Sequence, residues 1–311
     1  MGNVINIESY TSDVPAIVTI GTFDGVHMGH QKIVKRLIKM AKQDGLRSVI
    51  LTFFPHPRMV LQTDANIKLI NTIDERREIL EALGLDYLII QKFTPEFSRL
   101  SAEDFVKQIL VDKLRVKKVI IGYDHRFGRN RNASIEDMKA FGDVYGFEVE
   151  EISAQDVDDV AVSSTKIRKA LNAGDIDKVN TFLGYQFMLT GIVVKGKGLG
   201  RQFEFPTANI HIEETYKLIP KHGAYVVVAT IDDKEVYGMM NIGVNPTVQG
   251  NGETIEVHFF DFNKDIYGSK IKVSLLHRLR DEQKFESVDQ LKAQLLKDKQ
   301  TAQAYISEYY S

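Results

Sequence analysis

Apolar and polar positions in the first half of the chain alternate between two kinds of pattern. Short apolar runs, typical of buried strands, occupy residues 16–21, 48–53, 87–91, 118–122 and 147–152. Segments with apolar residues at helical spacing lie between them, at residues 31–43, 74–83, 102–113 and 135–145. This alternation predicts a parallel β-sheet with helices on both faces, an α/β fold.

The pattern changes near residue 184. Short strand-like runs separated by turn residues follow, at residues 187–194, 224–231, 236–242, 255–261 and 270–276. Closely spaced short strands predict an antiparallel barrel or sandwich. The last segment, residues 288–309, has apolar residues at helical spacing and is expected to form a terminal amphipathic helix. We therefore predict two domains, residues 1–184 and 185–311.

Composition narrows the classes of function. The chain has no Cys, which excludes disulfides, thiolate catalysis and cysteine zinc sites and is compatible with a reducing compartment. Its 40 basic and 42 acidic residues nearly balance, so no broad nucleic-acid surface is expected. No signal peptide pattern and no apolar run of about 18 residues are seen. We expect a cytoplasmic protein with neither nucleic acid nor membrane as a partner.

Residues 21–30, GTFDGVHMGH, carry the most informative pattern. A strand runs into a glycine-rich turn, and a helix begins directly after it. A helix N-terminus presents free N–H groups and a positive dipole end, which suit an anion, and His27 and His30 can add donors. A metal site at these histidines is the alternative, but no Cys or acidic cluster lies at ligand spacing nearby. The turn therefore points to nucleotide phosphate chemistry.

Three further segments are expected at the same edge of the sheet: TFFPHP at residues 52–57, GYDHRFG at 122–128 and SSTKIR at 163–168. The first has a rigid loop as its alternative interpretation, because two prolines fix its backbone. In the last, hydroxyls that suit a helix N-terminus combine with Lys166 and Arg168, which indicates a second anion site.

These four segments, in this order, resemble the FMN adenylyltransferase module of bacterial bifunctional riboflavin kinase/FAD synthetases, including the HxGH signature of nucleotidyltransferases. The resemblance implies a Rossmann-like domain in which the FMN phosphate attacks the α-phosphorus of ATP, giving FAD and pyrophosphate. It implies catalytic roles for His27 and His30. By the same resemblance ATP is bound by Gly21, Phe23, Asp24, His27, His30, Ser163, Ser164, Thr165 and Arg168, and FMN by His56, Pro57 and Asp124. His125 stands where the family usually carries Phe.

In the second half, residues 191–209 read GIVVKGKGLGRQFEFPTAN. No helical pattern follows the glycine run, which argues against a dinucleotide-binding turn. A glycine loop can instead close over phosphates, while oxygens of Thr207 and Asn209 suit Mg²⁺. A plain glycine-rich hairpin is the alternative.

Strand alternation places Glu256, His258 and Phe260 on one face. We interpret this face as pointing inward, where an acidic residue is costly unless it has a task. The alternative is a solvent-facing glutamate on an edge strand.

Residues 185–311 resemble the riboflavin kinase module, including LRDEQKF at residues 279–285. The resemblance implies a six-stranded antiparallel Greek-key β-barrel with a terminal helix, in which Glu256 is the general base for the riboflavin hydroxyl. It further implies Mg²⁺ ligands at Thr207 and Asn209, ATP binding by Gly196, Gly198, Gly200 and Asn241, and flavin binding by Arg280 and Glu256. Glu204 stands where the phosphate loop usually has Gly. Its charge and bulk lead us to expect either a different conformation of this loop or reduced kinase activity.

Together these observations predict an enzyme that makes FMN from riboflavin and then FAD from FMN, using Mg²⁺ and ATP. A nucleotidyltransferase acting on a pantetheine or pyridine mononucleotide substrate is one alternative, and the PTAN segment and Glu256 argue against it. A flavin-sensing or RNA-binding regulator is another, and turnover of ATP would distinguish it.

Overall fold

The structure, a computed structural model, describes residues 3–62, 67–122, 125–152, 162–196, 205–245 and 252–310. The chain divides into two compact units, Met1–Ser164 and Thr165–Ser311.

The first unit is built on a six-stranded parallel sheet with the strand order β1-β4-β3-β2-β5-β6. Its strands are β1 (Asn3–Asn6), β2 (Ala16–Ile20), β3 (Arg47–Phe54), β4 (Tyr87–Lys92), β5 (Val116–Gly122) and β6 (Glu148–Ile152). The predicted parallel sheet is confirmed. The edge strand β1 is an addition, because its four residues are too few for a clear periodicity.

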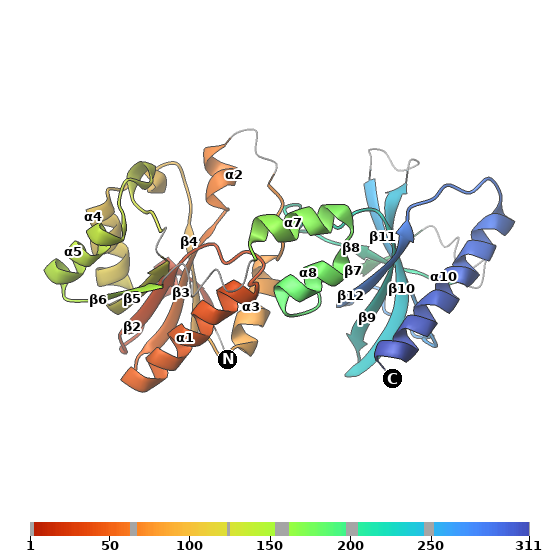
Figure 1. Ribbon diagram of the computed structural model, residues 1–311, viewed down its shortest axis with the longest axis horizontal. Helices are drawn as coiled ribbons and strands as arrows, with labels where there is room; N and C mark the ends of the chain where they lie inside the picture. The colour runs from red at the N-terminus through yellow and green to blue at the C-terminus, as the bar shows by residue number, and fades with distance from the viewer. Residues whose placement is uncertain are drawn as a thin grey trace. The chain divides into compact units, whose positions relative to one another are not determined.

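Helices cover both faces of this sheet (Figure 1). On one face α1 (Met28–Asp44) and α3 (Ile73–Ala82) pack through residues such as Leu37 and Leu80. On the other face, a second apolar cluster contains residues of α4 (Ala102–Phe105), its π-helical continuation Val106–Lys113 and α5 (Ile135–Tyr145). Short elements complete the unit: helix α2 (Pro57–Leu61) and the 3-10 helices Ile7–Ser9, Phe97–Arg99 and Arg129–Arg131.

The strand order fixes where ligands can bind in the first unit. From β2 the chain moves to β3 and β4 on one side, and later returns to β5 on the other side of β2. The two directions diverge at β2, so the carboxyl end of this strand lies at the switch point where open α/β sheets bind ligands. The glycine-rich turn of residues 21–27 follows β2 directly.

The second unit contains a closed antiparallel barrel with the strand order β10-β11-β8-β7-β12-β9. Its strands are β7 (Met188–Val194), β8 (Ala208–His211), β9 (Gly223–Ile231), β10 (Lys234–Asn245), β11 (Gly252–Phe259) and β12 (Lys270–Asp281). The expected six-stranded barrel is confirmed. The hydrophobic pattern alone missed β8, which has only four residues.

Three helices pack on the outside of this barrel. Helix α10 (Val288–Tyr309) buries Ala302 against Val226 and Met239, and Figure 1 shows it lying along the strands. Helices α7 (Ser164–Ala173) and α8 (Ile176–Leu183) precede β7. Asn180 of α8 donates to the Leu275 carbonyl at 2.9 Å and accepts from the Phe187 amide at 2.7 Å, which ties the helix to the barrel.

Candidate functional sites

The segment of residues 21–30, here called the histidine turn, has a strained backbone. Phe23 and Val26 have positive φ angles of 47° and 34°, a region that L-residues and above all β-branched ones rarely adopt. Between them Gly25 has φ 87°, where its missing side chain also avoids Ile70. Such strain persists only where surrounding contacts fix the conformation, and it is frequent at functional sites.

The side chain of Asp24 is buried and lies within a network of internal contacts. Its Oδ1 accepts hydrogen bonds from the amides of Ile70 and Asn71 at 3.0 and 3.3 Å, and lies 3.5 Å from the guanidinium of Arg76. Its backbone carbonyl accepts from the Ser164 hydroxyl at 2.8 Å. Asp24, predicted to bind the nucleotide, thus also holds the turn in place.

His27 and His30 are brought together as the sequence predicted. Their rings stack at 3.7 Å between centroids, and the Nδ1 of His27 accepts the His30 amide at the N-terminus of α1. Phe23 packs on the His30 ring at 4.9 Å. A Cβ at Gly29 would approach the His27 ring to 3.3 Å, a tight contact that would require a small shift of the ring.

Burial makes both histidines weak bases. It lowers the pKa of His27 to about 4, against an opposing effect of Asp24. It also lowers the pKa of His30 well below the ordinary value, with further contributions from His27 and Arg76. Because Nδ1 of His27 accepts, its neutral ring carries the proton on Nε2, which can donate to a phosphate oxygen. Nδ1 of His30 is buried without a hydrogen-bond partner among the described residues. A helix N-terminus with such donors suits a polyphosphate.

The other residues predicted for the first site have varied positions. His56 caps α2, where its Nδ1 accepts the Arg58 amide at 3.2 Å, and Pro57 is the first helical residue. Ser163 and Ser164 are half-buried. Thr165 and Arg168 lie on α7 in the second unit. Asp124 is outside the described residues, and the half-buried His125 ring stacks on Phe127 at 6.2 Å.

The second candidate site is a row of polar side chains across three barrel strands. Glu256 of β11 lies directly opposite Asn209 of β8 and Asn241 of β10. Directly opposed residues of antiparallel strands project from the same face, so the three side chains are neighbours. The Thr207 hydroxyl donates to Oε2 of Glu256 at 3.3 Å. Glu256, Thr207 and Asn209, separated in sequence, therefore meet at one place.

This row lies on the outer face of the barrel, which corrects the expectation that Glu256 points inward. Met239 is opposite both Val226 and His258, and it packs with Val226 under Ala302 of α10. His258 is two residues from Glu256 and shares that face. Glu256 itself is half-buried. The barrel interior takes the alternate residues, such as the fully buried Val257.

Gly196 packs tightly against Asn209, the proposed metal ligand. A Cβ at Gly196 would lie 2.2 Å from the Asn209 side-chain nitrogen. Gly198, Gly200 and Glu204, also predicted for the phosphate loop, lie outside the described residues.

Arg280, predicted to bind flavin, forms a strong internal ion pair. Its Nε and a terminal nitrogen donate to the buried carboxylate of Asp298 on α10 at 2.9 and 2.7 Å. Gln294 adds a third donor to Asp298 at 2.7 Å. The Arg280 guanidinium lies 6.0 Å from the Phe285 ring, so its position is fixed by helix α10 and the segment that precedes it.

Two buried charged residues near these sites, Arg76 and Asp298, had no counterpart in the sequence prediction, and a third buried polar residue, His258, was predicted only to share the face of Glu256. Burial lowers the pKa of His258, whose Nδ1 lies 2.9 Å from the Pro206 carbonyl. The local sequence gave no signal for Arg76 or Asp298, because both occur on helices rich in charged residues and their partners are distant in the chain.

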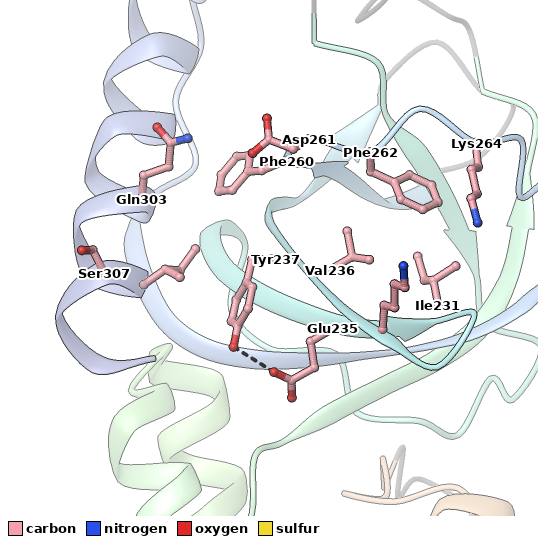
Figure 2. A pocket seen from close by; sticks show the side chains of 12 residues that line it. Ile231, Glu235, Val236, Tyr237, Phe260, Asp261, Phe262, Lys264, Gln303 and Ser307 are labelled. Atoms are coloured by element: carbon pink, nitrogen blue, oxygen red, sulfur yellow. Dashed lines mark hydrogen bonds between the residues drawn. The ribbon is translucent and has the colours of Figure 1, made fainter. Parts of the chain in front are cut away.

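A pocket of about 610 Å³ lies on the barrel unit (Figure 2). It lies between the β9–β10 hairpin, the end of β11 and α10, and its lining includes Tyr237, Phe260, Phe262 and Lys264. None of the residues predicted for either site lines it within the described part of the chain.

The candidate metal ligands in this protein are hydroxyl and amide oxygens and not a cluster of acidic side chains. Among the described residues, no three His, Cys, Asp or Glu side chains gather in a way that could hold a metal ion. The hydroxyl and amide oxygens of Thr207 and Asn209 fit Mg²⁺, which takes few protein ligands and completes its shell with phosphates and water. In the part of the chain that the structure describes, no helix is long and apolar enough to cross a membrane.

Comparison with known families matches both halves of the chain. The FAD synthetase family model matches residues 10–166, and the riboflavin kinase family model matches residues 183–306. A crystal structure from Streptococcus pneumoniae, described as a macrolide-efflux protein, superposes with a TM-score of 0.85 at 30% identity, over 100% of this chain and 99% of that one. That likeness supports the two-unit architecture.

Relatives of similar length match almost the whole chain. The bifunctional riboflavin kinase/FMN adenylyltransferase of Listeria monocytogenes is 36% identical over 96% of this chain and 94% of its own. The enzymes of the same name from Bacillus subtilis and Escherichia coli are each 35% identical, over 94% and 93% of this chain and 93% and 92% of their own lengths. The chain belongs to the family of bifunctional riboflavin kinase/FMN adenylyltransferases, which phosphorylate riboflavin to FMN and adenylylate FMN to FAD with ATP.

Proposed function

We propose that the histidine turn is the adenylyl-transfer site, and the observation that carries this is the stacked pair His27 and His30 at the N-terminus of α1. Its position at the switch point of the sheet supports the same assignment. The triphosphate of ATP binds the helix N-terminus, and Nε2 of His27 donates to a phosphate oxygen. An oxygen of the FMN phosphate attacks the α-phosphorus, and the bond to pyrophosphate breaks as FAD forms, without a covalent protein intermediate. Charge that develops on the α-phosphate is stabilised by these donors.

The remaining predicted residues complete this site in the proposal. Ser163, Ser164, Thr165 and Arg168 bind the triphosphate, and His56, Pro57 and Asp124 bind FMN. The Ser164 hydroxyl already reaches the histidine turn through the Asp24 carbonyl, which supports its part in the assignment.

For riboflavin phosphorylation we propose that Glu256 is the general base. It accepts the proton of the ribityl hydroxyl as that oxygen attacks the γ-phosphorus of ATP, and ADP leaves. Thr207 and Asn209 hold Mg²⁺, which neutralises phosphate charge when bound, and Asn241 with the loop glycines 196, 198 and 200 binds ATP. The contact of Thr207 with Glu256 at 3.3 Å supports placing metal and base side by side.

We also propose residues 1–184 and 185–311 as the two functional domains and the cytoplasm as the location. The lack of Cys is compatible with a reducing compartment. This boundary assigns helices α7 and α8 to the first functional domain. In the structure, however, α8 is hydrogen-bonded to the barrel through Asn180 and Leu275. Separate expression of the two segments, with assays of each activity, tests the boundary.

Chromatography of flavins tests the proposal as a whole. The pure protein is incubated with ATP and Mg²⁺, with riboflavin in one reaction and FMN in another. We expect FMN and FAD from riboflavin. FAD formed only from supplied FMN would contradict an active kinase site and make Glu204 the first residue to revert to Gly. No product in either reaction would contradict both assignments.

A further inference from the structure

We propose that Arg76 is a positioning residue for adenylyl transfer, whose forked guanidinium holds the histidine turn in the conformation that aligns His27 and His30. This inference rests on the function proposed for that turn. Arg76 lies on α3, and both it and Asp24 are only 1% exposed.

The guanidinium contacts the turn at two points on either side of Phe23. One terminal nitrogen donates to the Thr22 carbonyl at 2.7 Å, and the other lies 3.5 Å from Oδ1 of Asp24. Thr52 of β3 joins the network, because its hydroxyl donates to the same Thr22 carbonyl at 3.3 Å. One planar group thus fixes the backbone before Phe23 and the side chain after it.

The turn needs such contacts because its conformation is unfavourable by itself. Positive φ angles at Phe23 and Val26 are unfavourable for L-residues, so other contacts must maintain them. Asp24 provides some of these contacts, because its carboxylate accepts hydrogen bonds from the backbone amides of Ile70 and Asn71. A carboxylate buried to this degree requires a cation, and Arg76 provides it.

The position of Phe23 links this network to the histidines. Phe23 lies between the two residues that Arg76 contacts, and its buried ring packs 4.9 Å from the ring of His30, which in turn stacks on His27. A shift of Phe23 would therefore displace the histidine pair. Misplacement of catalytic groups by about 1 Å costs about 10²-fold in rate.

A buried ion pair is a poor source of stability, because desolvation offsets most of the attraction. The ion pair of Arg76 with Asp24 beneath the turn is better explained by the directional contacts that the guanidinium makes. Lysine would keep the charge, but its single ammonium lacks the planar fork that spans two fixed acceptors. Arg76→Lys therefore separates charge from geometry.

The test measures FAD formation from FMN and ATP by the full chain carrying Arg76→Lys. We expect kcat to fall by about 10²-fold, with much smaller changes in KM, because alignment in the transition state is lost. Riboflavin phosphorylation by the same chain is the internal standard and stays unchanged. Arg47→Lys is the matched control, since Arg47 pairs with Asp86 at 3.5 Å at the opposite end of β3 and should leave both activities intact.

A second variant guards against a trivial folding defect. Asp24→Asn with Arg76→Met removes both charges and leaves no unpaired ion. A low kcat with a wild-type melting temperature and an unchanged KM for ATP supports positioning, because loss of an ATP contact of Asp24 would raise that KM. An Arg76→Lys enzyme with wild-type kcat, or a loss fully accounted for by the unfolded fraction, overturns it. Wild-type protein that makes no FAD would instead contradict the function proposed for the turn.

Discussion

Glu256 and Asn209 face each other directly across strands β11 and β8, although 47 positions separate them in the chain. The Thr207 hydroxyl, two residues before Asn209, donates to the Glu256 carboxylate. Barrel closure thus brings a candidate base next to candidate oxygen ligands for Mg²⁺. Neither group could perform the proposed phosphorylation alone, since one handles the proton and the other the phosphate charge.

Glu256→Gln should abolish riboflavin phosphorylation and spare FAD formation from FMN. The amide keeps the shape of the side chain but cannot accept the proton, so we expect a loss of about 10²–10⁴-fold in kcat. Both activities are measured by chromatography of flavins. Glu253→Gln is the matched control on the same strand, because that exposed carboxylate pairs with His222 and lies outside the polar row. Loss of both activities in a folded Glu256→Gln protein would contradict two separate sites.

His30→Ala should have the reverse effect. The change removes a half-buried ring from the proposed phosphate site, and with it the surface on which Phe23 and His27 pack, so FAD formation should fall by about 10²–10³-fold. Riboflavin phosphorylation should remain. His211→Ala on barrel strand β8 serves as a histidine control. Adenylyl transfer at the wild-type rate in the variant would remove His30 from the mechanism.

Gly196→Ala should weaken the binding of Mg²⁺-ATP at the kinase site without unfolding the barrel. An alanine Cβ would overlap the end of the Asn209 side chain, which can move aside at little cost but then no longer faces Glu256. We expect a higher KM for ATP, an unchanged melting temperature and normal FAD formation from FMN. Lys195→Ala, at the exposed neighbouring position, is the control. An unchanged KM would show that the position of Asn209 is irrelevant to ATP.

The sequence predicted the fold because its main determinants are local. The strands from β2 to β6 and helices α1, α3 and α5 each carry their own periodicity, and the histidine turn carries its motif within ten residues. Local pattern could not reveal strand β8, whose four residues include two polar ones. The local pattern also could not show whether Glu256 faces the inside or the outside of the barrel, because both faces of β11 are partly apolar. The outer face is recognised only by its packing against α10.

Arg76 shows a second limit of sequence reasoning. Helix α3 reads IDERREILEA, in which an arginine among charged residues is expected to be exposed. Its burial results from tertiary contacts with Thr22, 54 positions earlier. Residues that support a site from behind are fixed by such distant contacts, so a motif search finds the groups that bind substrate and misses those that hold them.

The free energy of unfolding of the first unit should decrease as the pH is lowered, because His27 is protonated more readily in the unfolded state. Its pKa is about 4 in the folded protein against an ordinary value of 6.5, mainly because it is buried. The unfolded state therefore binds more protons between these values. Stabilisation is full above pH 6.5 and is lost as pH falls toward 4, by about 2 kcal/mol between pH 7 and 5. His30 acts in the same direction.

Urea unfolding followed by circular dichroism at pH 7 and 5 measures this loss. His27→Asn keeps a side chain that can cap α1 but cannot titrate, so the difference between the two pH values should shrink by about 2 kcal/mol. His222→Asn, at a half-exposed position in the second unit, is the control for the histidine-to-asparagine exchange itself. An identical fall with pH in wild type and His27→Asn would show that His27 does not lose its proton on folding.

Asp298→Asn should loosen helix α10 from the barrel. The Asp298 carboxylate is 4% exposed and accepts from both Arg280 and Gln294, so neutralising it leaves the arginine without its charged partner. Because Arg280 remains partly accessible to water, we expect a loss of about 2 kcal/mol in unfolding free energy, below the range for fully buried pairs. Glu308→Gln on the same helix is the exposed control. If Arg280 also binds flavin, the KM for riboflavin should rise in Asp298→Asn, whereas a purely structural pair would change stability alone.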